Sequence, residues 1–139
     1  LGVVCEIGIF LWMPRLTRRF SLRQMLLASF AGAVLRFLMI GWGVGWIAVV
    51  VLAQMLHAVT FGVYHAAAVE MVHRFFRGKH QSRGQALYNS FTFGAGGTLG
   101  GLYAGMIWES LGAPATFTIA AGFALLALLL VAWKGDAPG

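Results

Sequence analysis

The chain has 139 residues, of which 60% are hydrophobic and only 10% are charged, and its mean hydropathy is +0.81. A soluble domain carries about 25% charged residues, so this composition excludes an ordinary soluble protein and indicates an integral membrane protein. The net charge of +6 does not predict a nucleic-acid-binding protein, because the basic residues cluster between apolar segments. The single cysteine, Cys5, excludes an internal disulfide and the usual cysteine-based zinc sites.

Five hydrophobic segments predict an all-α polytopic membrane bundle with five transmembrane helices, at about residues 1–13, 25–43, 46–71, 85–108 and 114–133. The first is too short to cross a bilayer before Pro14, which we expect to end that helix. This suggests that the chain begins inside a helix and is a fragment of a longer protein. Pro114 is expected to start the fifth helix, and residues 134–139 are expected to form a polar cytoplasmic tail.

The basic residues alternate between the two sides of this predicted bundle. Nine of the ten fall after the first, third and fifth segments, and the tenth, Arg36, lies inside the second segment. Because cytoplasmic loops of membrane proteins are enriched in lysine and arginine, both basic loops and the C-terminus are expected in the cytoplasm. The sequence therefore predicts a multi-pass protein of the inner (plasma) membrane with residue 1 toward the outside.

The third segment carries a stripe of polar residues inside an otherwise apolar run. At 100° per residue, the stripe covers an arc of about 140° on one side of a helix. Lipid cannot satisfy polar groups at mid-depth, so this face is expected to line protein or a water-filled cavity. The residues of the stripe are Gln54, His57, Thr60, Tyr64 and His65.

Glu6 and Arg36 lie near the middle of the first and second segments. A charged residue at the centre of a spanning helix costs about 2.5–3.5 kcal/mol on the insertion scale, so the two are expected to compensate each other or to pair with the stripe. They mark an ion or substrate pathway or, as the alternative, a buried pair that only sets helix register. His57 is the main candidate for proton handling, since imidazole titrates nearest physiological pH. A simple hydrogen bond between helices is its alternative.

The fourth segment adds Tyr88 and Asn89 as candidate cavity residues. Gly97, Gly101 and Gly105 recur every four residues, a spacing that favours close packing of helix backbones. The run GAGGTLG lies in an apolar segment with no strand before it, so it does not predict a nucleotide site.

No metal site, cofactor or enzyme active site is predicted. Glu70, His73 and His80 fit no common metal-ligand spacing. An intramembrane enzyme would need a nucleophile with a base, and Cys5 and Ser90 have no evident partner.

The order of these features resembles the C-terminal half of a major facilitator superfamily transporter, in the branch of lactose permease and the phenylpropionate permeases. The resemblance rests on Glu6 in a helix before Pro14, the basic run RLTRRFSLRQMLL, Arg36 in the next helix, and His57 in MLHAVTF. It covers essentially the whole chain and implies helices eight to twelve of twelve, with the missing N-terminal half as partner. It also implies substrate binding by Glu6 and proton coupling by Arg36 and His57.

One position departs from the lactose permease pattern. That protein has a second carboxylate three residues after its histidine, where this chain has Thr60, so LHAVTFGVYHAA is more similar to the phenylpropionate branch. Our hypothesis is that Glu6 carries the coupled proton, modulated by Arg36 and His57; alternatively, Arg36 holds a substrate carboxylate.

The function expected from the resemblance is proton-coupled symport of a small organic solute by alternating access, with an aromatic carboxylate such as phenylpropionate favoured. The alternatives are a sugar or nucleoside proton symporter and a non-transporting membrane subunit. The expected partners are a small-molecule substrate and the lipid bilayer, with no nucleic acid and H⁺ as the only coupling ion.

Overall fold

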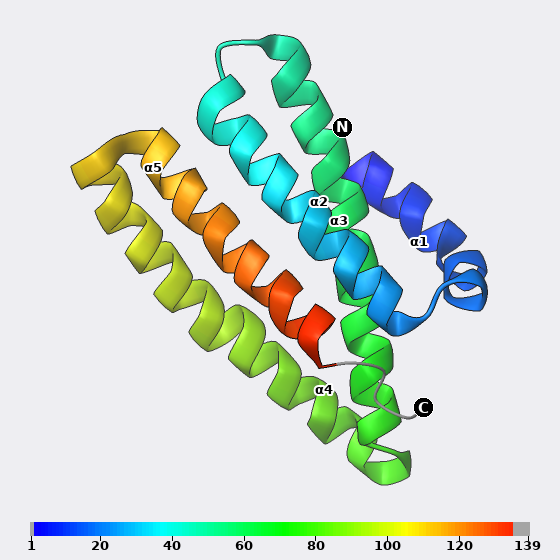
Figure 1. Ribbon diagram of the computed structural model, residues 1–139. Coiled ribbons are helices and arrows are strands. Elements are labelled where there is room, and N and C mark those ends of the chain that lie inside the picture. The colour runs from blue at the N-terminus through cyan, green and yellow to red at the C-terminus, as the bar shows by residue number, and fades with distance from the viewer. Residues whose placement is uncertain (1, 135–139) are drawn as a thin grey trace.

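The structure, a computed structural model, describes residues 2–134, and these residues form helices and short connections without any strand. Leu1 and residues 135–139, most of the expected tail, lie outside the described part. Figure 1 shows the helices in chain order, which are α1 (Gly2–Arg19), α2 (Leu22–Gly43), α3 (Ile47–Phe75), the 3₁₀-helix η1 (Gly78–His80), α4 (Gln81–Asn89), the π-helix η2 (Ser90–Gly96) and α5 (Gly97–Trp133). The predicted all-α class is confirmed.

Helix α5 consists of two legs that meet at Gly112. The backbone of Gly112 is not helical (φ 82°, ψ −178°), and Pro114 follows in the first turn of the second leg. Figure 1 shows the chain reversing there, so that the second leg returns beside the first. The rings of Tyr103 and Phe123, one from each leg, pack edge to face with centroids 6.5 Å apart. Pro114 therefore begins a helical leg, as predicted.

Three helical stretches in the described residues are long and apolar enough to cross a membrane: Leu22–Gly43, Ile47–Phe75 and Gly78–Trp133. The third has 56 residues and includes both legs of α5, together with α4 and η2. Helix α1 is not among the three, because several arginines lie in its last turns. The count of five spans remains a prediction.

The prediction that Pro14 ends the first helix was wrong, since α1 continues through Pro14 to Arg19. A proline inside a helix lacks the N–H that would bond to the preceding turn. Here Met13, before the proline, belongs to the buried core, and Leu16, after it, packs against that core. These contacts hold the segment helical, and the hydroxyl of Thr17 donates to the Met13 carbonyl at 3.1 Å.

The turn between α1 and α2 is therefore shorter than the basic run suggested. It consists of Phe20 and Ser21, and α2 begins with a capping box. The Ser21 hydroxyl accepts from the Gln24 N–H at 3.2 Å, while the Gln24 side chain accepts from the Ser21 N–H at 3.0 Å. This reciprocal pair satisfies two N–H groups that the helix start leaves free.

Helix α2 lies at the centre of the bundle, packing against α3 on one side and α5 on the other, and α1 packs against α3. Helices α2 and α3 are tightly packed at Gly32, where an added Cβ would collide with the methyl group of Thr60. Many large apolar side chains are exposed on the outer faces; Leu99, Leu102 and Met106 are 64–71% exposed. Such a surface suits lipid rather than water.

The glycine repeat of the fourth predicted segment does not mediate close packing within the described chain, contrary to expectation. A Cβ added at Gly97, Gly101 or Gly105 would meet no atom within 4 Å. The spacing permits close approach of helices, but among the described residues no helix comes within 4 Å of these Cβ positions.

Candidate functional site

Three ionisable side chains from three different helices meet at one place. Arg36 of α2 and His57 of α3 are hydrogen-bonded, with Nη1 of the arginine 2.9 Å from Nδ1 of the imidazole. On its other side, Nε2 of His57 lies 3.9 Å from Oε1 of Glu6 on α1. The structure therefore brings together Glu6, Arg36 and His57, the three ionisable candidates predicted from the sequence, with His57 between the other two.

This geometry determines which nitrogen of His57 carries its proton. A guanidinium has donors and no acceptor, so Nδ1 of His57 accepts the hydrogen bond from Arg36 and holds no hydrogen. The neutral ring then carries its hydrogen on Nε2, the nitrogen that faces Glu6. A proton added at Nδ1 would break the bond to Arg36 and set two cations side by side.

Arg36 is held between the histidine and an aromatic ring. Its Cζ lies 4.4 Å from the centroid of the Phe37 ring, within the range of a cation–π contact. Its Nε is buried and has no hydrogen-bond partner among the described residues. A buried donor without an acceptor is costly, so this guanidinium retains unused capacity to bind an anion.

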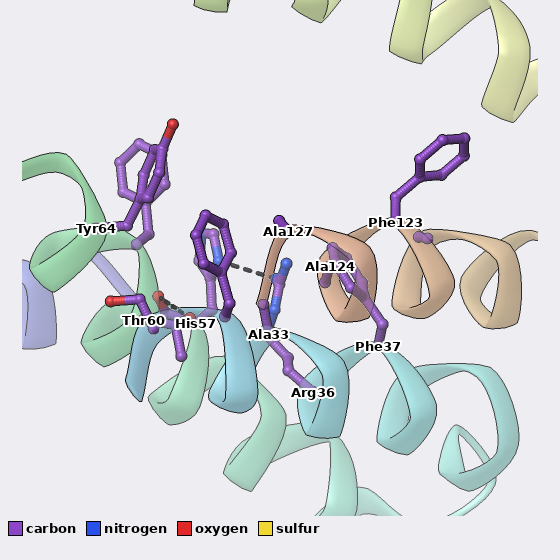
Figure 2. Close-up of a pocket in the computed structure, with 13 residues that line it drawn as sticks. Ala33, Arg36, Phe37, His57, Thr60, Tyr64, Phe123, Ala124 and Ala127 are labelled. Carbon is purple, nitrogen blue, oxygen red and sulfur yellow. Dashed lines mark hydrogen bonds between the residues drawn. The ribbon is translucent and has the colours of Figure 1, made fainter. Parts of the chain in front are cut away.

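A cavity of about 430 Å³ adjoins Arg36 and His57. Its wall is mostly apolar and comes from α2, α3 and the second leg of α5 (Figure 2). Tyr64 lies at one end of the view and Phe123 at the other, with the dashed Arg36–His57 bond between them. Tyr64 also packs on Phe30, with ring centroids 5.7 Å apart. This combination of aromatic wall and few polar groups is typical of small-molecule sites.

Thr60 and Gln54 of the predicted stripe differ in where the structure places them. Thr60 lines the cavity but is 6% exposed, and its hydroxyl donates to the Leu56 carbonyl at 2.8 Å. Its methyl group packs toward Gly32 of α2. Thr60 thus acts mainly in packing between α2 and α3. Gln54 is exposed and is not among the residues that line the cavity.

His65 and Tyr88 belong to a second cluster, displaced along α3 toward η1. The His65 ring lies 6.2 Å from Tyr88 and 6.1 Å from Phe93 of the π-helix, measured between centroids. Asn89 is exposed and accepts a 3.4 Å hydrogen bond from Gln85. The structure thus groups His65 with Tyr88, and leaves Asn89 at the surface.

The aromatic residues that join and border these clusters were not predicted from the sequence. Phe61 stacks between the two histidines, 5.6 Å from His57 and 6.0 Å from His65 between ring centroids. The spacing of four residues between these positions was the available signal, because it places all three on one helix face. Phe37 offered no such signal, since its importance depends on helices distant in sequence.

No group of three or more histidine, cysteine or acidic side chains within residues 2–134 is arranged to hold a metal ion. Glu70, considered above as a ligand, instead accepts a hydrogen bond from Arg74 one turn later, at 3.0 Å.

Apolar helices enclose a cavity lined by Arg36 and His57, with Glu6 beside the histidine, and this is the architecture of a membrane-embedded helix bundle. The chain belongs to the MFS_1 like family of the major facilitator superfamily, whose family model matches residues 1–119. This family consists of transporters and not of enzymes.

A relative in Escherichia coli (strain K12), "Probable 3-phenylpropionic acid transporter", is 36% identical over 132 residues, which is 94% of this chain and 34% of the relative. The chain therefore spans about a third of the length of that protein. No solved structure matched the chain.

Proposed function

We propose that this chain is the C-terminal part, helices eight to twelve of twelve, of a proton-coupled symporter for a small aromatic carboxylate. Alternating access in such a protein exposes one central site first to one side of the membrane and then to the other. The observation that carries the proposal is the position of His57, hydrogen-bonded to Arg36 and 3.9 Å from Glu6. The printed name of the E. coli relative supports the choice of substrate class.

Arg36 is the proposed ligand of the substrate carboxylate. Its buried, unpartnered Nε is a donor that needs an acceptor, and a carboxylate can accept two parallel hydrogen bonds from a guanidinium. The aromatic part of the substrate would occupy the 430 Å³ cavity against rings such as Phe30 and Tyr64. In this proposal Glu6 belongs to the proton pathway. Arg36 binds the substrate, a role that the resemblance to lactose permease implied for Glu6.

Coupling follows from competition for Arg36. While Arg36 donates to Nδ1 of His57, that nitrogen cannot take a proton. A carboxylate that draws the guanidinium toward itself frees Nδ1, and a proton can then be shared by His57 and Glu6. The imidazolium formed is balanced by the glutamate on one side and the bound carboxylate on the other. Substrate and proton therefore favour each other's binding, as symport requires.

The orientation proposed for the protein follows its charge pattern. Arg15, Arg18 and Arg19 at the end of α1, and Lys79 near the start of α4, would face the cytoplasm of a multi-pass inner-membrane protein. Helices α1, α2 and α3, the stretch from α4 to the end of the first leg of α5, and the second leg of α5 would each cross the bilayer. The other half of the protein would complete the pocket.

The test is uptake by the purified full-length protein in proteoliposomes, with labelled phenylpropionate and with or without an inward proton gradient. Wild-type protein should accumulate the acid only with the gradient. Glu6→Gln should abolish accumulation while exchange of internal for external substrate continues, because exchange needs no net proton movement. Glu70→Gln is the matched control, since Glu70 pairs with Arg74 outside the cavity; it should behave as wild type. Unchanged gradient-driven accumulation in Glu6→Gln would remove the proton assignment.

The alternative functions give different results in the same assay. A sugar or nucleoside symporter would accumulate those solutes and ignore the aromatic acid. A non-transporting membrane subunit would accumulate neither.

A further inference from the structure

The cavity beside Arg36 shares part of its wall with a second cavity. The second has a volume of about 410 Å³ and lies between α2 and the two legs of α5. Phe37 of α2 and Ala120 of α5 belong to the lining of both. Because alanine has a single methyl group, the Phe37 ring is the larger part of the shared partition.

The ring of Phe37 is held in this position from two directions. The Arg36 guanidinium lies 4.4 Å from its centroid. Phe117 of the second leg of α5 packs against it with centroids 6.3 Å apart, and Phe117 in turn meets Trp108 edge to face at 6.1 Å. Phe37, Phe117 and Trp108 thus form a row of packed rings, and Arg36 lies against the first of them.

The second cavity has the chemistry of a hydrocarbon site. Tyr103, Trp108 and Phe117 contribute aromatic surface, and Gly100, Ala104 and Gly105 leave room between them. No charged side chain lines it, so it suits an alkyl or aryl group and not a second carboxylate.

We infer that Phe37 determines the length of the acids that the transporter accepts, by closing the Arg36 cavity against the second one. The inference rests on the proposed function, because the substrate carboxylate is placed on Arg36. An acid short enough to fit the first cavity binds with the ring in place. A longer acid would have to displace Phe37 from both the guanidinium and Phe117. Without the ring, its hydrocarbon end extends into the second cavity.

The experiment compares phenylacetate, phenylpropionate, phenylbutyrate and phenylvalerate as substrates of the full-length protein in proteoliposomes. In wild type, kcat/KM should fall for acids beyond the preferred length. Phe37→Ala should move the optimum to the longer acids. The kcat/KM for phenylvalerate relative to that for phenylpropionate should rise roughly tenfold, as expected for extra methylenes in an apolar pocket. Phe37→Leu, which disturbs packing less, should shift the ratio in the same direction by a smaller factor.

Two controls separate this role from a general loosening of the fold. Phe30→Ala removes a ring of the same size that lines only the first of the two cavities and packs on Tyr64 of that same cavity, so it should change kcat/KM for all four acids alike. Gly105→Leu fills the second cavity at a position where an added Cβ meets no atom within 4 Å. In the Phe37→Ala background it should restore the preference for the shorter acid.

A binding measurement adds a readout independent of transport. Trp108 lines the second cavity, so phenylvalerate should change its fluorescence in Phe37→Ala and leave it unchanged in wild type, with Trp108→Phe identifying the signal. If wild type transports the acids and Phe37→Ala leaves their order unchanged, the inference fails while the proposed function stands. If wild type transports none of them, the proposed function fails and this inference fails with it.

Discussion

Arg36 and His57, 21 positions apart in the sequence, are joined across α2 and α3 by a hydrogen bond of 2.9 Å from Nη1 to Nδ1. The bond keeps Nδ1 of the imidazole unprotonated, so that the ring is neutral, and its Nε2 faces Glu6. One contact therefore relates a candidate anion-binding group to a candidate proton-binding group. Among the described residues of the stripe, His57 is the one placed between an arginine and a glutamate.

Replacing His57 should separate its two roles. In His57→Asn, the amide oxygen can still accept from Arg36 but the side chain cannot take a proton. Wild-type affinity for the acid should rise as pH falls toward 6, because protonation of the His57–Glu6 pair accompanies carboxylate binding. In His57→Asn the affinity for the acid should depend less on pH, and gradient-driven accumulation should be lost. Measurements use the full-length protein, with KM determined from pH 6 to 8, above the range in which the acid itself is protonated.

His57→Phe is the companion variant, because it keeps a ring to stack on Phe61 and removes both nitrogens. Its affinity for the acid should lose the pH dependence as well. This affinity should also differ from that of His57→Asn, since position 57 no longer offers Arg36 a hydrogen-bond acceptor. A full wild-type pH profile in either variant would contradict the coupling mechanism.

Gly32 should be intolerant of any side chain. A Cβ at this position collides with the methyl group of Thr60, so Gly32→Ala should destabilise the protein by about 1–3 kcal/mol, the usual cost of overpacking. Thermal unfolding of the detergent-solubilised protein measures the change. Gly101→Ala, where a Cβ meets nothing within 4 Å, is the control and should be neutral or slightly stabilising. Thr60→Ser removes the opposing methyl group and should restore stability to Gly32→Ala.

Gly112 should be required for the reversal of α5. Its φ of 82° with ψ of −178° is a conformation that only glycine adopts readily. Gly112→Ala should cost about 1–3 kcal/mol and broaden the unfolding transition, because the two legs lose their fixed relationship. Gly45→Ala, in the turn between α2 and α3 and without a positive φ, should unfold as wild type does. Equal melting temperatures for the two variants would show that the turn at Gly112 tolerates a side chain and would contradict this prediction.

Arg23 should hold the end of α5 against the start of α2. Its Nη2 donates to the Ala132 carbonyl at 2.8 Å and its Nε to the Val131 carbonyl at 3.4 Å. A cation at a helix C-terminus satisfies free carbonyls and opposes the helix dipole, so Arg23→Ala should cost about 1 kcal/mol. Hydrogen exchange should accelerate in the last turn of α5. Arg83→Ala, an exposed arginine of α4, should leave that exchange unchanged.

Several features of this protein were determined by the sequence itself. Long apolar runs interrupted by basic clusters specify helices in a membrane, because a backbone in lipid must satisfy its hydrogen bonds within each segment. The cost of a charge at mid-depth likewise made Glu6 and Arg36 candidates, and the titration range of imidazole added His57. The structure shows His57 hydrogen-bonded to Arg36 and 3.9 Å from Glu6. These inferences depend on local composition and on the helical period, both of which can be read from a linear chain.

The tertiary structure alone decided how the helix faces meet. It carried α1 through Pro14, because core contacts on both sides of the proline outweigh one lost hydrogen bond. It directed the Thr60 hydroxyl to the Leu56 carbonyl of its own helix and left Gln54 exposed. It also left no atom within 4 Å of a Cβ added at Gly97, Gly101 or Gly105. It also placed Phe37 in the lining of two cavities. The physical reason is that each of these outcomes depends on which side chains of distant segments approach within a few ångströms, and a helical period specifies a face but not what packs against it.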